Sequence, residues 1–187
     1  MIKDGKVHNQ KYDKFKQINR FLEFVDDILP EILKPILNED KTQKRPLEIT
    51  DFGCGKSYLT FALYHYLVVI KRLKANIKGL DLKKDVINHC NNLPEKCGYA
   101  SLIFTTGDIV EYRDSQKDAE NPLDLVITLH ACDTATDYAL AYAVEHKSKG
   151  ILSVPCCQHE INSQLKKQCS EPSLNALLKH GIVKERF

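Results

Sequence analysis

The chain has 187 residues, of which 43% are hydrophobic and 28% charged, and its formal net charge is +2. This composition is typical of one soluble globular domain with a sizeable core, and it excludes disordered, collagen-like and low-complexity proteins. The longest apolar stretch, residues 59–70, is too short to span a membrane, and seven cysteines argue against a disulfide framework, so we expect a cytoplasmic protein.

Residues 1–46 are predicted to be a helical segment that packs on the main domain. Apolar residues recur at helical spacing between residues 12 and 29, which predicts an amphipathic helix. Pro30 and Pro35 are expected to end it, before a charged connector over residues 38–46. The first twenty residues carry six basic and two acidic side chains, so they either contact a polyanion or form a solvated helix face.

Residues 47–187 are predicted to form the main domain, in which strands and helices alternate. Strands are expected at 47–53, 77–82, 101–108, 124–131 and 150–157, and helices at about 57–74, 85–97, 134–146 and 173–181. The strands are apolar on both faces, which predicts an α/β fold: a Rossmann-like, doubly wound, mostly parallel sheet with helices on both faces. Such sheets bind ligands beyond the carboxyl ends of their strands, so those residues are the candidates for function.

The first strand ends in a glycine-containing turn. Gly53 and Gly55 allow a tight turn and a close approach of ligand to backbone, and the following helix offers free N–H groups. The third glycine of a dinucleotide fingerprint is absent, because Tyr58 stands there. Asp51 would repel a pyrophosphate but suits an α-amino group or a sulfonium. The alternative is an ordinary turn between a strand and a helix.

Two further aspartates follow the next two strands. Asp81 can accept hydrogen bonds from both hydroxyls of a ribose, with Leu82 against an adenine; alternatively it caps the next helix, for which Asp85 is better placed. Asp108 suits an adenine amino group, with Ile109 against the ring, or it belongs to an ordinary turn. Acids at the ends of three successive strands favour an adenosyl ligand with a positive charge.

Titratable side chains also follow the fourth and fifth strands. They are His130 and Asp133, then Cys156, Cys157 and His159. We expect them to border a substrate pocket, with His130 as a general base for a hydroxyl acceptor. The alternatives are structural roles: a helix cap for Asp133, a hydrogen-bonded histidine, buried cysteines, or a zinc site, although the C-x-x-C spacing of structural zinc sites is absent.

Four runs together resemble a known family: DFGCGKSYL (51–59), GLDLKKD (79–85), LHACDTATD (129–137) and LSVPCCQH (152–159). They resemble class I S-adenosylmethionine-dependent methyltransferases, and more narrowly bacterial methyltransferase-domain proteins related to tRNA 2′-O-ribose methyltransferases. The resemblance implies S-adenosyl-L-methionine as the cofactor and favours RNA (tRNA or rRNA) as the acceptor, with protein and small molecules left open. It implies a cofactor site of Asp51, Gly53, Cys54, Gly55, Asp81, Leu82, Asp108, Ile109 and Leu129, and a catalytic pocket of His130, Asp133, Cys156, Cys157 and His159.

The chain departs from the family at three places. Ser57 stands where many relatives have a third glycine, and Asp133 where the tRNA enzymes tend to have glycine. Strands six and seven of the family's sheet are not evident after Cys157, which predicts either a sheet without that edge or a fragment of a longer protein. Two other functions stay open: a non-catalytic RNA-binding or assembly module that keeps the pocket, and a nucleotide-dependent oxidoreductase on the same fold.

Overall fold

The computed structural model describes the backbone of residues 2–3 and 6–7 and the whole of residues 11–115, 122–129, 131 and 134–155. A short antiparallel hairpin of β1 (Ile2–Lys3) and β2 (Lys6–Val7) comes first. The elements that follow are α1 (Tyr12–Leu33), the 3-10 turn η2 (Lys34–Ile36), β3 (Leu47–Phe52), α2 (Tyr58–Tyr64), the π-helical turn η3 (His65–Ile70), β4 (Ala75–Asp81), α3 (Lys84–Cys97), β5 (Leu102–Thr106), α4 (Ile109–Ser115), β6 (Leu125–Thr128), α5 (Thr134–Glu145) and β7 (Gly150–Ser153).

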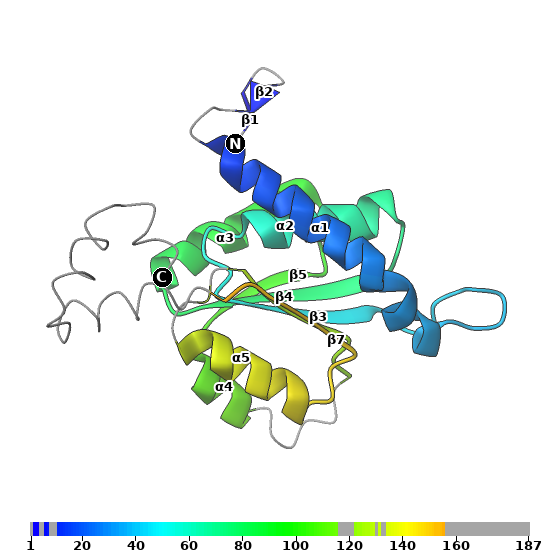
Figure 1. Ribbon diagram of the computed structural model, residues 1–187. Helices are drawn as coiled ribbons and strands as arrows, with labels where there is room; N and C mark the ends of the chain where they lie inside the picture. The colour runs from blue at the N-terminus through cyan, green and yellow to red at the C-terminus, as the bar shows by residue number, and fades with distance from the viewer. Residues whose placement is uncertain are drawn as a thin grey trace, which may run out of the picture.

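Five parallel strands form the central sheet in the order β5-β4-β3-β6-β7. Helices α1, α2 and α3 cover one face and α4 and α5 the other (Figure 1). This confirms the predicted doubly wound α/β fold. The sheet begins with its central strand β3 and continues outward through β4 to β5. The chain then returns to the other side of β3, where β6 and β7 complete the sheet. The crevice between the carboxyl ends of β3 and β6 is therefore the point where ligands bind in such sheets.

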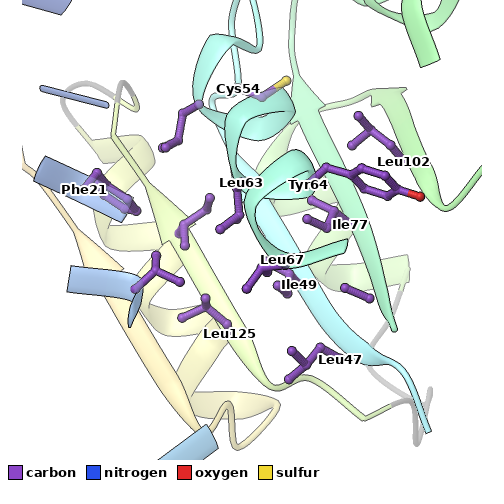
Figure 2. Packing of buried hydrophobic residues seen from close by; sticks show 14 of the residues in the cluster. Phe21, Leu47, Ile49, Cys54, Leu63, Tyr64, Leu67, Ile77, Leu102 and Leu125 are labelled. Atoms are coloured by element: carbon purple, nitrogen blue, oxygen red, sulfur yellow. The ribbon is translucent and has the colours of Figure 1, made fainter. Parts of the chain in front are cut away.

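The sheet is buried because apolar side chains leave it on both faces. On the α1–α2–α3 face, Phe21, Leu63 and Leu67 lie in one buried cluster with the strand residues Ile77 and Leu125 (Figure 2). The opposite face holds a second cluster that includes Phe52, Leu80, Val126, Ala139 and Tyr142. Within it the rings of Phe52 and Tyr142 meet edge to face, with their centroids 5.1 Å apart. The two clusters fix β3 and β6 from both sides, and these strands carry the candidate site.

Helix α1 continues through Pro30 to Leu33, so the predicted break at Pro30 is wrong. Proline removes one backbone donor and usually kinks a helix interior. Here Pro30 is exposed, while Leu29 and Ile32 on either side of it are buried, with 6% and 3% of their surfaces exposed. The amphipathic face therefore holds the last turn against the sheet, and the helix ends only at Lys34, whose N–H donates to the carbonyl of Pro30.

Three other local predictions differ from the structure. The helix expected at 57–74 is α-helical only to Tyr64, continues as a π-turn and ends at Ile70. Helix α4 was not predicted, because seven residues hold too few turns for a periodic signal. Asp85 does not cap α3: the capping position is Lys83, without a side-chain cap, and Asp85 lies in the first turn. The segment expected to lack strands six and seven, and the helix expected at 173–181, lie outside the described residues.

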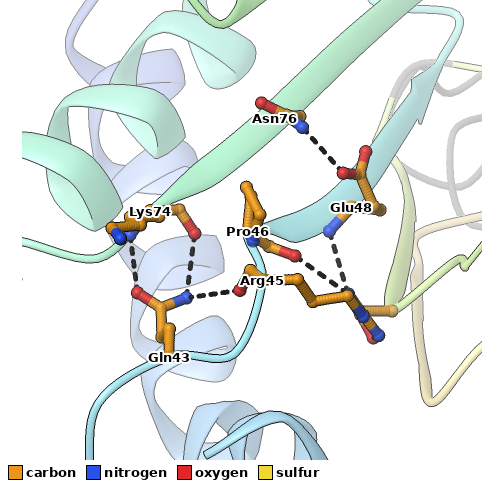
Figure 3. Close-up of polar contacts among 7 residues, drawn as sticks. Gln43, Arg45, Pro46, Glu48, Lys74 and Asn76 are labelled. Atoms are coloured by element: carbon orange, nitrogen blue, oxygen red, sulfur yellow. Dashed lines mark hydrogen bonds and ion pairs between the residues drawn. The ribbon is translucent and has the colours of Figure 1, made fainter.

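A polar network fastens the connector before β3 to the amino ends of the strands (Figure 3). The Gln43 side chain exchanges two hydrogen bonds with the backbone of Lys74, at 2.6 and 2.9 Å. Arg45 donates to both carboxylate oxygens of the fully buried Asp124, which also accepts the N–H of Glu48. This network lies at the end of the sheet opposite to the candidate site. None of the described helices combines the length and apolar character needed to cross a membrane.

Candidate functional site

The turn after β3 has an unusual backbone. Gly53, Gly55 and Ser57 all adopt left-handed conformations, with φ of 69°, 53° and 58°. A Cβ on Gly53 would lie 3.0 Å from the backbone of Ala131, so only glycine lets this turn pack against the segment after β6. Ser57 adopts the left-handed conformation at the position where the resemblance expects a third glycine, and its Oγ donates to the carbonyl of Gly55 at 3.2 Å. The turn therefore closes one side of the crevice between β3 and β6.

Asp81 ties this turn to the neighbouring strand. Its Oδ2 accepts the N–H of Gly55 at 2.8 Å, and its Oδ1 accepts the N–H of Lys83 at 3.0 Å. The N–H of Lys83 precedes the first turn of α3, and no side chain caps this helix, so the capping alternative for Asp81 is not realised. A carboxylate offers about four lone-pair positions, so Asp81 keeps room for two hydroxyl donors. These two bonds fix the carboxylate in place, so its remaining lone pairs have a defined direction.

Asp51 is the most deeply buried acid of the candidate site. Only 2% of its surface is exposed, and its Oδ2 accepts a hydrogen bond from the Thr60 hydroxyl of α2 at 2.6 Å. Burial raises the pKa of Asp51 to about 7; the charge of Asp81 adds to this increase, and the bond from Thr60 opposes it. Burial disfavours the ionised form of the carboxyl group, and a cation that binds beside it stabilises that form. Asp51 therefore suits the ammonium group of an amino acid.

A small pocket opens beside Asp51. It is bordered by Lys14 of α1, Gly53, Cys54, Tyr58 of α2 and Leu129, among others. Cys54 and Leu129 are buried and form apolar walls, with 7% and 5% exposed. Burial raises the pKa of the Cys54 thiol, so the thiol stays protonated at neutral pH. A wider hollow on the α4–α5 face is lined by Glu48, Lys78 and Tyr112 among others. It lies away from the carboxyl ends of the strands and from the glycine turn, so it is separate from the candidate site.

The remaining predicted adenine contacts are arranged less uniformly. Asp108 Oδ1 accepts the N–H of Val110 at 2.7 Å, so one oxygen belongs to the turn that starts α4, and the other keeps the predicted role open. Ile109 packs in the cluster with Phe52 and is only 8% exposed. Leu82 is 65% exposed and open to a ligand. The N–H of Gly107 donates to the carbonyl of Asp81 at 3.1 Å, which brings the ends of β4 and β5 together.

The structure brings the predicted cofactor residues to one edge of the sheet. Asp51, Asp81 and the glycine turn converge there, with Asp108 at the end of the adjacent strand. The predicted catalytic residues His130, Asp133, Cys156, Cys157 and His159 lie outside the described residues. Among those that are described, no three His, Cys, Asp or Glu side chains gather as metal ligands would. Two further residues of the site were not predicted from the sequence. Lys14 was considered only as part of a basic segment, and Thr60 lies in an apolar helical pattern that carries no signal for a polar contact.

The groups at the carboxyl edge of the sheet fit S-adenosylmethionine. The ligand needs an acceptor for two ribose hydroxyls, an acid near its ammonium group and a close backbone approach along its length. Asp81, Asp51 and the Gly53 turn provide these three features within one crevice. The same carboxylates would repel the pyrophosphate of a dinucleotide, because both lie beside the turn.

Comparisons with known proteins agree with this geometry. The sequence matches a family model described as a methyltransferase domain over residues 13–164. No curated protein matches the sequence. Among solved structures, monomeric WbdD is similar with a TM-score of 0.55 and 18% identity over 84% of this chain and 35% of that chain. Magnesium protoporphyrin IX methyltransferase (ChlM) from Synechocystis PCC 6803, with bound SAH, gives 0.50 and 16% over 91% and 70%.

The two structural similarities are at low identity and show the fold alone. The chain spans about a third of WbdD. The family match is more specific, because residues 13–164 include every described residue of the candidate site. It confirms S-adenosylmethionine as the cofactor, whereas no comparison tests the narrower relationship to RNA-modifying enzymes. The chain belongs to the methyltransferase-domain family.

Proposed function

We propose that the chain transfers the methyl group of S-adenosylmethionine to RNA. The observation that carries the methyl-transfer part is the convergence of Asp51 and Asp81 on the glycine turn at the carboxyl edge of the sheet. The cofactor supplies an electrophilic methyl group on a sulfonium, which needs no activation by the protein. The work of the chain is then to bind, to orient and to exclude water, which contributes up to about 7–11 kcal/mol in favourable reactions.

The described residues divide this work. Asp81, held by the N–H groups of Gly55 and Lys83, accepts the ribose hydroxyls. Asp51, held by Thr60, pairs with the ammonium group of the methionine portion. A hydroxyl acceptor must lose a proton as the new bond to the methyl carbon forms and the bond from that carbon to sulfur breaks, and we assign this proton to His130, because histidine is the side chain that titrates near neutral pH. Asp133 is assigned either to orient His130 or to take the proton in its place, and the resemblance assigns Cys156, Cys157 and His159 to the border of the acceptor pocket.

The choice of RNA is supported by the resemblance and by charge near the pocket. Lys11 and Lys56 are exposed and lie close enough to Lys14 to lower the pKa of its ammonium group. Phosphate groups of RNA are bound by such lysines. Not all of the basic segment contributes, because Lys16 and Arg20 form ion pairs with acids on their own helix, as expected for a solvated helix face.

Calorimetry on the purified chain tests the cofactor site. We expect S-adenosylmethionine to bind, and Asp81→Ala to weaken binding at least tenfold, because the two hydrogen bonds to ribose are lost. Asp81→Asn separates this effect from misfolding, since the amide oxygen still accepts one backbone N–H. Asp85→Ala is the matched control, an exposed acid in the first turn of the next helix. Unchanged affinity in both Asp81 variants would remove the assignment.

Transfer of a labelled methyl group tests the acceptor. The chain is incubated with labelled S-adenosylmethionine and, separately, with total RNA, with cell protein and with a small-molecule extract. We expect label in RNA, and a reduced yield in the Lys11→Gln, Lys56→Gln double variant at unchanged cofactor affinity. Label only in protein or in small molecules would refute RNA as the acceptor and leave methyl transfer standing. Cofactor and RNA binding without transfer to any fraction would instead support the non-catalytic module.

A further inference from the structure

Lys14 stands apart from the other basic residues of α1. It lies in the first turn of the helix, and its side chain borders the same pocket as Asp51, Gly53 and Leu129. Its ammonium nitrogen lies 5.5 Å from the centre of the Tyr58 ring, which also borders the pocket. Lys14 is only partly exposed, whereas Lys11 and Lys16 are exposed. The side chain is therefore directed to the pocket wall and away from the open helix surface.

The charge of Lys14 has no counter-charge among the described residues. Burial lowers the pKa of its ammonium group, and repulsion from Lys11 and Lys56 lowers it further. No carboxylate in the described part of the chain forms an ion pair with Lys14, unlike Lys16, which pairs with Asp13. An anion bound between the lysines would relieve this repulsion.

The pocket thus has two poles of opposite sign. Asp51 offers a buried carboxylate on β3, and Lys14 offers an ammonium group from α1 across the same pocket. An α-amino acid carries an ammonium and a carboxylate on one carbon atom, so it presents the opposite charge to each pole. The Tyr58 ring and the buried Leu129 line the pocket between these poles, and charged hydrogen bonds are stronger beside such apolar groups than in water.

We propose that Lys14 binds the carboxylate of the methionine portion of S-adenosylmethionine, so that α1 contributes to the cofactor site. This inference rests on the proposed binding of S-adenosylmethionine beside Asp51. It assigns the partly buried lysine to the cofactor and leaves the exposed Lys11 and Lys56 for RNA phosphates. The segment before the main domain is then part of the site and does more than cover the sheet.

Calorimetry with two ligands tests the assignment on the full chain. The first ligand is S-adenosylmethionine, and the second is decarboxylated S-adenosylmethionine, which keeps the adenosyl group, the sulfonium and the ammonium. We expect the wild type to bind the first ligand at least tenfold more tightly. Lys14→Gln should weaken the first ligand at least tenfold and the second less than twofold, so that the variant no longer distinguishes them. Lys14→Arg should restore most of the preference, because it retains the charge.

The matched control is Lys16→Gln, which removes the same charge from an exposed position of the same helix, where it pairs with Asp13, and should leave both affinities within twofold. Equal weakening of both ligands by Lys14→Gln would show that the lysine only shapes the pocket, and would overturn the inference. Unchanged cofactor affinity with weaker RNA binding would assign Lys14 to a phosphate and also overturn it. Failure of the wild type to bind either ligand would instead reject the proposed function itself, and the inference with it.

Discussion

Replacing Asp51 by asparagine separates what this residue does for the fold from what it does for the cofactor. The carboxyl is buried, and among the described residues the Thr60 hydroxyl is the one donor to it. An asparagine amide is nearly the same size, and its oxygen accepts the same hydrogen bond without a charge. We therefore expect Asp51→Asn to make the free protein more stable at neutral and alkaline pH, and to weaken S-adenosylmethionine binding at least tenfold.

The size of the stability effect follows from the pKa of Asp51, which rises from 3.8 to about 7 on folding. Between these values the folded state binds a proton more tightly than the unfolded state. The contribution of Asp51 therefore becomes steadily more destabilising as the pH rises from about 4 to about 7. The full difference corresponds to about 4 kcal/mol above pH 7 and about 2 kcal/mol at pH 5. The advantage of the variant should thus grow by about 2–3 kcal/mol between pH 5 and pH 8.

Urea denaturation at pH 5, 6, 7 and 8 measures this difference for the wild type, for Asp51→Asn and for the exposed control Asp85→Asn. The control should show no such trend. Calorimetry in buffers of different ionisation enthalpy gives the second readout: the wild type should release a proton when the cofactor binds below pH 7, and the variant should release none. A stability difference that is constant across pH would refute the buried-carboxylate reasoning, and unchanged cofactor affinity would refute the ammonium contact.

Three further outcomes follow from the packing. Gly53→Ala should lower the free energy of unfolding more than Gly98→Ala. Both glycines have φ of 69°, which costs alanine about 1–2 kcal/mol, but only the Cβ added at Gly53 meets backbone atoms, at 3.0 Å. Equal losses of stability in urea denaturation would contradict this. Asp124→Ala should cost at least about 2 kcal/mol by thermal unfolding, because it removes the buried acceptor of Arg45 and of the Glu48 N–H, and a loss below about 1 kcal/mol would argue against it. Leu63→Ala should cost about 2–5 kcal/mol by the same assay, because Leu63 is fully buried in the core. The affinity for the cofactor should not change, and a loss of affinity would show that packing of the core also controls the geometry of the site.

The sheet could be predicted from the sequence because its signals are local. Short apolar runs such as 47–53 end in glycine or aspartate, and the alternation with helices determines the parallel order. The extent of the helices could not. Pro30 is a strong local breaker, yet burial of Ile32 keeps α1 intact, and packing energy of this kind is invisible in a single sequence. Helix α4 is too short for any periodicity.

The candidate site was predictable to the extent that it lies on strand ends. Asp51 and Asp81 follow from the rule that parallel strands share one edge, since residues at that edge must be neighbours. Their partners did not follow from the sequence. Thr60 lies nine residues after Asp51 and meets it only because α2 folds back over β3, and Lys14 reaches the pocket from a helix outside the alternating pattern. Contacts of this kind depend on how helices are placed over the sheet.

The Arg45–Asp124 pair lies at the amino end of the sheet, opposite to the carboxyl end that carries the candidate site. It anchors the start of β3 and the start of β6 to the connector, and it shares no hydrogen bond with the glycine turn or with Asp81. A substitution in the loops at the carboxyl edge therefore leaves the hydrogen bonds of the anchored end in place, so loss of ligand binding and loss of this anchor can be separated by mutation.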